Sequence, residues 1–229
     1  MKANQPILQS KLTPPYTART LRRPRLEEKL KAITYKKLAF IIAGAGYGKS
    51  TLVAQTVSGL DADAIWYNLD QSDSDLTTFM THLLVGLRKH MPDIGAGARP
   101  KLTAPLISGE SRRKLLVSFI SEMEKHLSNP IILVLDDFYL IQESQDILQA
   151  VEFLLNQMPE RFHLVIISRM EPGLKLSRYR ATTDIIELGE EDLAFNCDEI
   201  NSLYQDLLDV RINPSQTDAL YAKTGGWAA

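Results

Sequence analysis

A glycine-rich segment, residues 43–50 with the sequence AGAGYGKS, joins a short apolar run to a sequence that begins as a helix. Glycine lets the backbone turn tightly with its N–H groups pointing inward, and the helix that follows adds the positive end of its dipole. This arrangement predicts a phosphate-binding loop between a buried strand and a helix. The predicted phosphate-binding residues are Ala43, Gly44, Ala45, Gly46, Tyr47, Gly48, Lys49, Ser50 and Thr51.

Two side chains of this loop have predicted chemical roles. Lys49 supplies a positive charge for the β- and γ-phosphates, which makes it a candidate catalytic residue, and Ser50 supplies a hydroxyl ligand for Mg²⁺. The strict pattern begins with glycine, whereas this chain has Ala43. The first position mainly closes the turn out of the strand, where a methyl group is tolerated, so the prediction stands.

Composition limits the compartment and the partners. With 26 basic and 28 acidic residues the net charge is −2, so no global field attracts nucleic acid or an anionic membrane. The single cysteine, Cys197, cannot form an internal disulfide, which favours a reducing compartment. No stretch approaches the roughly 18 apolar residues of a membrane span, and the N-terminus lacks a signal-peptide core. We therefore expect a cytoplasmic protein without membrane contact.

Short apolar runs alternate with longer amphipathic segments, a pattern typical of βα units. It predicts an α/β fold of the P-loop NTPase class, with a five-stranded, mostly parallel sheet covered by helices on both faces. The expected strands are 38–43, 65–69, 131–135, 164–167 and 185–188, and the expected helices are 25–32, 49–59, 75–90, 111–127, 144–157, 197–208 and 214–223.

We divide the chain into three regions. Residues 1–33 form a Pro- and Arg-rich lead-in with a helix, residues 34–192 the NTPase core, and residues 193–229 the start of a small helical lid. Within the core, residues 92–110 are rich in Pro and Gly and predict a long surface connection. The C-terminal sequence TGGWAA turns into small helix-favouring residues, so we expect the lid to be truncated.

Two adjacent carboxylates follow the predicted strand at 131–135. In a P-loop protein a carboxylate at such a strand end reaches the metal shell, so Asp136 is the candidate Mg²⁺ partner together with Ser50. Asp137 is the candidate to orient and deprotonate an attacking water. A strand-end turn or a helix cap is the simpler interpretation of the pair.

A cation follows the predicted strand at 164–167. Arg169 at this strand end would place a guanidinium near the γ-phosphate, where it senses or stabilises charge. The simpler interpretation is a surface arginine paired with a carboxylate. Asp70, Asp73 and Asp75 are better explained by helix capping around Ser74, and the histidines lack the spacing of a metal cluster.

The combined motifs resemble one family. These are residues 43–52, the segment Trp66-Tyr67-Asn68-Leu69-Asp70, residues 133–137, residues 167–169, the segment 22–26 and Thr224-Gly225-Gly226-Trp227. Together they are similar to the ATPase module of MalT-type regulators, LuxR-family transcription activators among the signal-transduction ATPases with numerous domains. The resemblance covers nearly the whole chain.

The resemblance implies a regulatory switch that binds ATP or ADP with Mg²⁺. ADP would favour a closed monomer, ATP with an inducer would favour a nucleotide-dependent homo-oligomer of the full-length protein, and slow hydrolysis would reset the state. Lys49, Asp137 and Arg169 would serve catalysis and sensing, and the segment Arg22 to Leu26 would lie near the adenine. DNA would be contacted only through a C-terminal helix-turn-helix that this chain does not contain.

Two other functions remain open from the sequence. A metabolic P-loop kinase would use Arg178 and Arg180 as a phosphate lid, although nothing marks an acceptor site. A non-hydrolysing interaction module would hold the nucleotide only as a structural element. Both share the phosphate loop with the switch, and the sequence does not firmly exclude GTP.

Overall fold

The computed structural model describes residues 8–94 and 109–227, and it centres on a five-stranded sheet. The strand order is β2-β3-β4-β1-β5, and every neighbouring pair is parallel. The strands are β1 (Leu38–Ile42), β2 (Asp63–Asn68), β3 (Ile131–Asp136), β4 (Phe162–Ser168) and β5 (Ile185–Leu188). The predicted α/β fold with a parallel sheet is confirmed.

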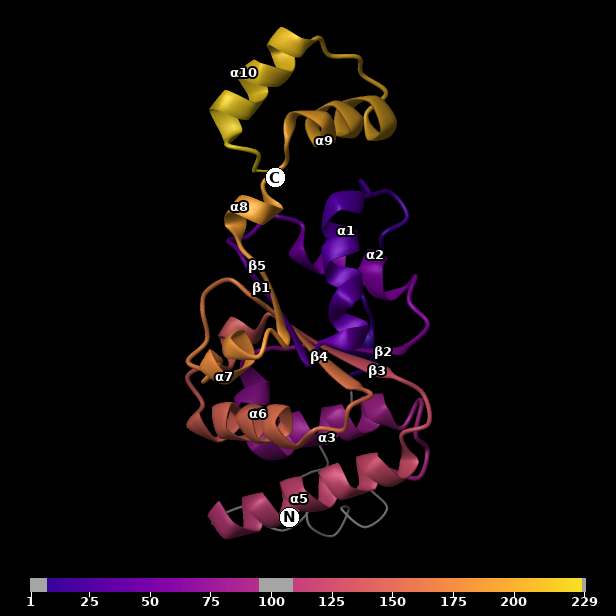
Figure 1. The fold of residues 1–229 in the computed structure, drawn as a ribbon, viewed down its shortest axis with the longest axis vertical. Helices are drawn as coiled ribbons and strands as arrows, with labels where there is room; N and C mark the ends of the chain where they lie inside the picture. The colour runs from indigo at the N-terminus through magenta and orange to yellow at the C-terminus, as the bar shows by residue number, and fades with distance from the viewer. Residues whose placement is uncertain (1–7, 95–108, 228–229) are drawn as a thin grey trace.

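Helices cover both faces of this sheet (Figure 1). Helices α1 and α2 lie on one face, α3 and α6 on the other, and α5 lies outside α3 and α6. The helices are α1 (Pro24–Lys31), α2 (Lys49–Val57), α3 (Leu76–Leu87), α5 (Gly109–His126), α6 (Gln145–Gln157), α7 (Ser177–Ala181), α8 (Glu190–Leu193), α9 (Cys197–Ser202) and α10 (Pro214–Thr224). None of the helices in the described ranges is long and apolar enough to cross a membrane.

Alternation along the strands separates two hydrophobic cores. Leu38 and Phe40 of β1 pack with α3, α5 and α6, whereas Ala39 and Ile41 pack with α1 and α2. Successive strand side chains point to opposite faces, so a strand covered on both sides is apolar throughout. Both β3 and β4 are buried along their whole length. This rigid centre fixes where the polar strand ends lie.

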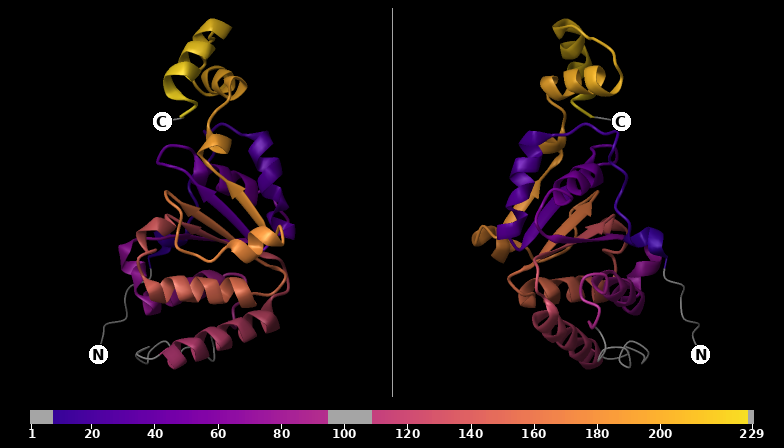
Figure 2. Two further views of the ribbon diagram at one scale, coloured as in Figure 1. Left: turned by 60° about the vertical axis from the view of Figure 1, so that its left-hand side comes forward. Right: turned by 90° about the vertical axis from the view of Figure 1, so that its right-hand side faces the viewer.

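The helical piece, residues 197–227, stands beyond the C-terminal ends of the strands (Figures 1 and 2). Its first helix, α9, ends at Ser202 and continues as a π-helical turn, Leu203–Leu207, so the expected helix at 197–208 changes pitch partway. Asn196 and Glu199 form the predicted capping box at its start. The short connection through α8 links this piece to β5, and neither α7 nor α8 was predicted.

Most of the predicted connection at 92–110 lies outside the described residues. The remaining boundaries differ from the predictions by a few residues, as at α3, which ends at Leu87. Strand β5 differs in character, because it forms an edge of the sheet and is only partly buried. Its neighbour is β1 alone, so Glu187 on this edge is exposed.

Candidate functional site

The glycine-rich loop connects β1 to α2 at the carboxyl edge of the sheet. Gly46 and Gly48 have φ angles of 82° and 72°, a region in which side chains with a Cβ are strained. Gly48 is the residue before α2, and its carbonyl accepts the first helical bond from the N–H of Leu52 at 2.9 Å. These two glycines therefore give the loop the turn that aims its N–H groups and the helix N-terminus at one place.

Lys49 crosses this loop and is held by its backbone. Its Nζ atom donates to the carbonyl oxygens of Ala43 at 2.8 Å and Gly44 at 2.7 Å. Burial lowers the pKa of Lys49, and the nearby charge of Arg169 lowers it further. An ammonium has three donors, so these bonds leave one for a ligand. The lysine is thus fixed in direction before any phosphate arrives.

Asp136 ends β3, and its carboxyl group faces the loop. It is 5% exposed, accepts a hydrogen bond from the N–H of Asp137 at 2.9 Å, and lies within hydrogen-bonding reach of the Ser50 hydroxyl. Burial raises its pKa, and the neighbouring charge of Asp137 adds to this rise. The geometry brings the predicted metal pair, Ser50 and Asp136, together.

This donor set fits Mg²⁺, which in phosphate sites binds one or two protein ligands and takes the rest from phosphates and water. Within residues 8–94 and 109–227 there is no group of three or more His, Cys, Asp or Glu side chains arranged to hold a metal. Ser50 and Asp136 suit a cation that arrives with a polyphosphate better than a resident metal ion.

Asp137 and Arg169 lie at the ends of adjacent strands. Asp137 follows β3 with a φ of 58°, a left-handed conformation that few residues other than glycine adopt. Arg169 follows β4, and its guanidinium carbon lies 4.8 Å from the centre of the Tyr139 ring. Both charges act on Lys49, Arg169 lowering and Asp137 raising its pKa. Asp137 and Arg169 are therefore close enough for their charges to influence the Lys49 ammonium, while the roles of all three side chains stay predictions.

A cavity of about 290 Å³ opens beside the loop. Three segments line it: residues 19–23 before α1, residues 48–55 of the loop and α2, and residues 195–207, which run from just before α9 to the end of the π-helical turn. Its size is near the lower end of small-molecule pockets, about 300 to 1,000 Å³. Of the segment predicted to lie near the adenine, only Arg23 lines the cavity, since Leu26 is fully buried in the core and Arg22 pairs with Glu27.

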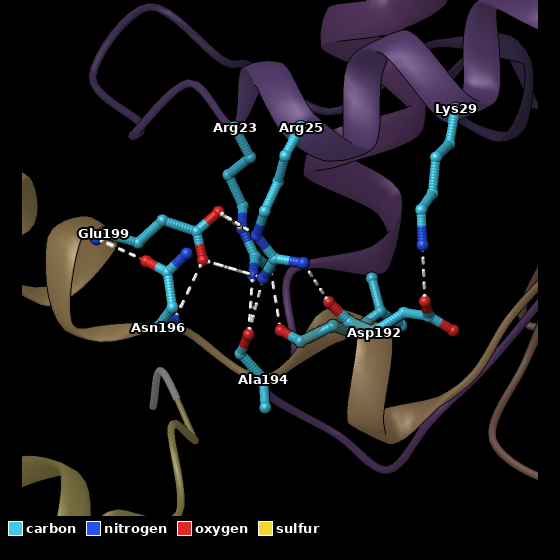
Figure 3. A network of polar contacts seen from close by, with 8 residues as sticks. Arg23, Arg25, Lys29, Asp192, Ala194, Asn196 and Glu199 are labelled. Carbon is cyan, nitrogen blue, oxygen red and sulfur yellow. Dashed lines mark hydrogen bonds and ion pairs between the residues drawn. The ribbon is translucent and has the colours of Figure 1, made fainter.

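We call residues 194–196, which connect α8 to the helical piece, the hinge. Arg23, before α1, and Arg25, within α1, bind both the hinge and the helical piece (Figure 3). Arg23 binds both carboxylate oxygens of Glu199, at 3.0 and 2.8 Å, and Arg25 binds the same oxygens at 3.0 and 2.9 Å. Their remaining donors bind the carbonyl oxygens of residues 192–194. We call Arg23, Arg25 and Glu199 the hinge clamp. It ties residues 23–25 to the helical piece, and Arg23 also lines the cavity.

Two of the three clamp residues, Arg23 and Glu199, are buried, and further contacts extend the clamp on both sides. The side chains of Arg23 and Glu199 are 5% and 10% exposed, and Arg23 stacks 4.4 Å from the centre of the Phe195 ring. Burial alone would raise the pKa of Glu199, but hydrogen bonds from Arg23 and Arg25 outweigh it and lower the pKa. Lys29 adds a bond of 2.8 Å to Asp192. Removing one partner would leave a buried charge unpaired.

Residues 19–169 match the family described as Nephrocystin 3, N-terminal, which is well over half of the chain. The chain belongs to this family. It is 31% identical over 97% of its length to the HTH-type transcriptional regulator MalT of Yersinia enterocolitica, and 30% identical to MalT of Cronobacter sakazakii. It spans 24% of the length of these curated relatives.

A solved structure shares the fold. It is the signal transduction ATPase with numerous domains (STAND) with a tetratricopeptide repeat sensor from Pyrococcus horikoshii, at a TM-score of 0.60 and 18% identity. The likeness covers 93% of this chain and 29% of that one. Together the comparisons identify a STAND-type P-loop ATPase module homologous to MalT regulators, in agreement with the resemblance found in the sequence.

Two contacts of this STAND-type module involve residues that sequence reasoning missed. Trp227 donates from Nε1 to the carbonyl of Ala45 at 2.9 Å, and Glu190 accepts from the N–H of Gly44 at 2.8 Å. Trp227 had a signal, because it belongs to the Gly-Gly-Trp motif, but no role was assigned to it. Glu190 is one of two adjacent glutamates, and no local pattern separates it from its neighbour.

The weaker candidates in this module have structural roles. Asp70 and Asp75 cap Gln71–Ser74 and α3, as predicted. Asp73 is fully buried and binds Lys11 and the Tyr67 hydroxyl at 2.6 and 2.7 Å. This network anchors the N-terminal segment beside β2 rather than forming a second site.

Proposed function

We propose that this chain is the switch module of a longer regulator, binding ATP with Mg²⁺ and hydrolysing it slowly. The observation that carries the proposal is the convergence of Lys49, Ser50 and Asp136 on one loop with a pocket-sized cavity beside it. The loop suits the phosphates, and the cavity suits the adenine ring. Bound Mg²⁺ would neutralise phosphate charge and orient the reacting oxygens.

The residues of the chain divide the work. Backbone N–H groups of residues 45–51 and the Lys49 ammonium bind the phosphates, whereas the N–H of Gly44 donates to Glu190. Ser50 and Asp136 hold the cation. Asp137 accepts the proton of the attacking water, and Arg169 contacts the charge at the γ-phosphate. The adenine ring is enclosed by residues 19–23 and 195–207. The influence of the charges of Asp136, Asp137 and Arg169 on Lys49, and the lining of the cavity, support these assignments.

Hydrolysis would act on the regulator by changing the ligand that contacts the hinge. The cavity wall contains Arg23 and Phe195, which stack on each other where the segment before α1 meets the hinge. A ligand that fits one arrangement of these walls better than another shifts the population of that arrangement. We propose that nucleotide state controls self-association of the longer, cytoplasmic protein in this way. Any contact with DNA would lie in another region of that protein.

The experiment compares binding and turnover in two variants. Asp137→Ala should retain ATP affinity within about twofold and lose hydrolysis by at least about tenfold, because it removes a general base and no phosphate contact. Asp198→Ala removes an exposed carboxylate of α9 and should change neither quantity. Phosphate release and calorimetry measure both. Equal turnover in the Asp137 variant and the wild type would contradict the assigned base.

A metabolic kinase is the second candidate, and the structure bears on its proposed lid. Arg180 is engaged by Glu187 at 2.7 Å and Glu171 at 3.0 Å, so its charge is already paired. A phosphate lid would have to break both pairs. Phosphoryl transfer to hydroxyl acceptors that exceeds transfer to water would favour the kinase over the switch. Absence of turnover above background in the wild type would favour the non-hydrolysing module.

A further inference from the structure

A carboxylate binds the phosphate loop itself. The Oε1 atom of Glu190 accepts a hydrogen bond from the N–H of Gly44 at 2.8 Å. The carbonyl of the same glycine accepts a bond from the Lys49 ammonium at 2.7 Å. Gly44 therefore stands between the cation that attracts phosphate and an anion that does not. A loop whose N–H groups attract anions is thus already bound by a carboxylate from α8.

The position of Glu190 follows from the sheet. Strand β5 lies next to β1, and both strands point their carboxyl ends toward the loop. Glu190 is the first residue of α8, two residues after β5 ends at Leu188, so its side chain reaches the start of the loop that follows β1. The negative charge of Glu190 acts on Lys49 and opposes the fall in its pKa. A charge that acts on Lys49 also acts on a phosphate bound there.

The contact to Gly44 does not require a charged side chain. A neutral glutamine would present the same carbonyl oxygen to the N–H. The capping bond of α8 comes from Asp192, which accepts from the N–H of Gly189 at 3.1 Å, so the helix start does not depend on Glu190. The negative charge is therefore separable from the local structure, and its consequence falls on the ligand.

We propose that Glu190 sets the phosphate specificity of the loop by weakening the binding of more highly charged nucleotides, so that ADP is favoured over ATP. The inference rests on the proposed nucleotide function and adds a specificity residue to it. Electrostatic repulsion grows with the charge of the ligand, and a triphosphate carries one more negative charge than a diphosphate. Glu190 thus biases the site toward the state that follows hydrolysis.

The same short helix also reaches the hinge. Asp192, two residues after Glu190, binds Lys29 through its carboxylate and Arg25 through its carbonyl oxygen. A bound triphosphate that repels Glu190 therefore acts on the helix that holds the hinge clamp. This gives the charge on the ligand a direct physical path to the helical piece.

Glu190→Gln and Glu191→Gln form a matched pair. Both remove one negative charge from adjacent, exposed positions of α8, but only the first changes the residue that contacts Gly44. Calorimetry with MgATP, MgADP and inorganic tripolyphosphate measures each affinity. Glu190→Gln should tighten the binding of MgATP about three- to tenfold, a modest gain because water partly screens the charge. The binding of MgADP should tighten by less, because the diphosphate carries one negative charge fewer. Glu191→Gln should change either affinity less than about twofold.

Four outcomes would overturn the inference. Equal effects of the two variants would show that only net charge matters. An equal gain in affinity for MgATP and MgADP in Glu190→Gln would show that Glu190 does not set the specificity. Failure of folded wild-type protein to bind any of the three ligands would remove the proposed function together with the inference, whereas normal wild-type binding with an inert Glu190→Gln would remove the inference alone. Glu190→Ala checks the hydrogen bond, because it removes both the charge and the acceptor for Gly44.

Discussion

The sheet core and the helical piece are stabilised by different kinds of interaction. Strand β4 is buried at all seven positions, and its five apolar residues belong to two continuous apolar cores. In residues 197–227, by contrast, the buried polar side chains Glu199 and Thr217 outnumber the one buried aliphatic residue, Ile200. Exposed apolar side chains there are Leu207, Leu208, Val210, Tyr221 and Trp227. The core depends on apolar burial, and the helical piece depends on polar contacts at its hinge.

This difference matters for a switch. Burial of apolar surface is non-directional and cooperative, so a core changes little until it unfolds. A few directional ion pairs and hydrogen bonds can be exchanged for others at small cost. Regions with few buried apolar contacts open with lower free energies than the core. We therefore expect ligand-dependent movement to be confined to the helical piece while the sheet keeps the loop in place.

The largest effect is expected from a substitution that removes a buried side chain from the sheet. Leu133→Ala, at a fully buried position of β3, should lower the free energy of unfolding by about 3 kcal/mol. Ile200→Ala, in α9, should lower it by about 1 kcal/mol or less, because the helical piece can open without unfolding the sheet. Urea denaturation followed by circular dichroism measures both losses. Equal losses would contradict the contrast between the two regions.

Breaking the hinge clamp should have the next largest effect, and it should be local. Glu199→Ala leaves Arg23 buried without its carboxylate, at a cost of about 2 to 3 kcal/mol to closure of the helical piece. Hydrogen exchange of amides in residues 197–227 should accelerate about 30-fold or more, while exchange in β3 stays unchanged. Glu28→Ala removes an exposed carboxylate that pairs with Lys31 and serves as the control. Uniform acceleration across the sheet would argue against a separate hinge.

Two adjacent glycines offer a finer comparison. Gly226 has a φ of 80°, and a Cβ there would lie 2.4 Å from the carbonyl oxygen of Phe195, whose N–H donates to the carbonyl of Gly226 at 2.8 Å. Gly225 has a φ of 60°, and a Cβ there would meet open space. Gly225→Ala should cost about 1 kcal/mol from backbone strain alone, and Gly226→Ala about 2 kcal/mol.

The readout is the rate of limited proteolysis within residues 197–227. Gly226→Ala should be cleaved several times faster than Gly225→Ala, because it also disrupts the contact with Phe195. Identical rates would mean that the contact between residues 195 and 226 does not hold the helical piece.

The smallest expected effect is a response to acid. The arginine hydrogen bonds lower the pKa of Glu199 below its usual 4.5 despite burial, so its stabilising contribution is complete above that pH. It is lost as the pH falls through the lowered pKa. The helical piece should therefore loosen below about pH 4.5 before the sheet does, and Glu199→Gln should remove that step. Amide chemical shifts of α9 and β3, recorded between pH 6 and pH 3, would separate the two regions.

Local sequence patterns predicted the sheet and the caps well. Continuous apolar runs specify buried strands, as at β3, and Asn196 with Glu199 three residues later specifies a capping box. The Ser50 and Asp136 pair could be expected because parallel strands bring their carboxyl ends to one edge. These features depend on periodicity or on a motif of fixed spacing, which a single sequence displays.

The hinge could not be predicted in the same way. Glu199 binds Arg23, 176 positions away in the chain, and Gly44 binds Glu190, 146 positions away. Neither pair has a sequence spacing that marks it, because each depends on how β5 and α8 return to the loop. The sequence identified Glu199 only as a capping residue, although its carboxylate both accepts the capping bond from Asn196 and binds the two arginines.

The central claim is that the loop and Lys49 bind a nucleotide polyphosphate. Titration calorimetry with MgATP on the wild type and on Lys49→Ala tests it most directly. We predict saturable binding to the wild type and a loss of at least about tenfold in affinity in Lys49→Ala, since a charged hydrogen-bond donor to phosphate is removed. Equal affinities in the two folded proteins, or no binding of MgATP to the wild type, would contradict the account.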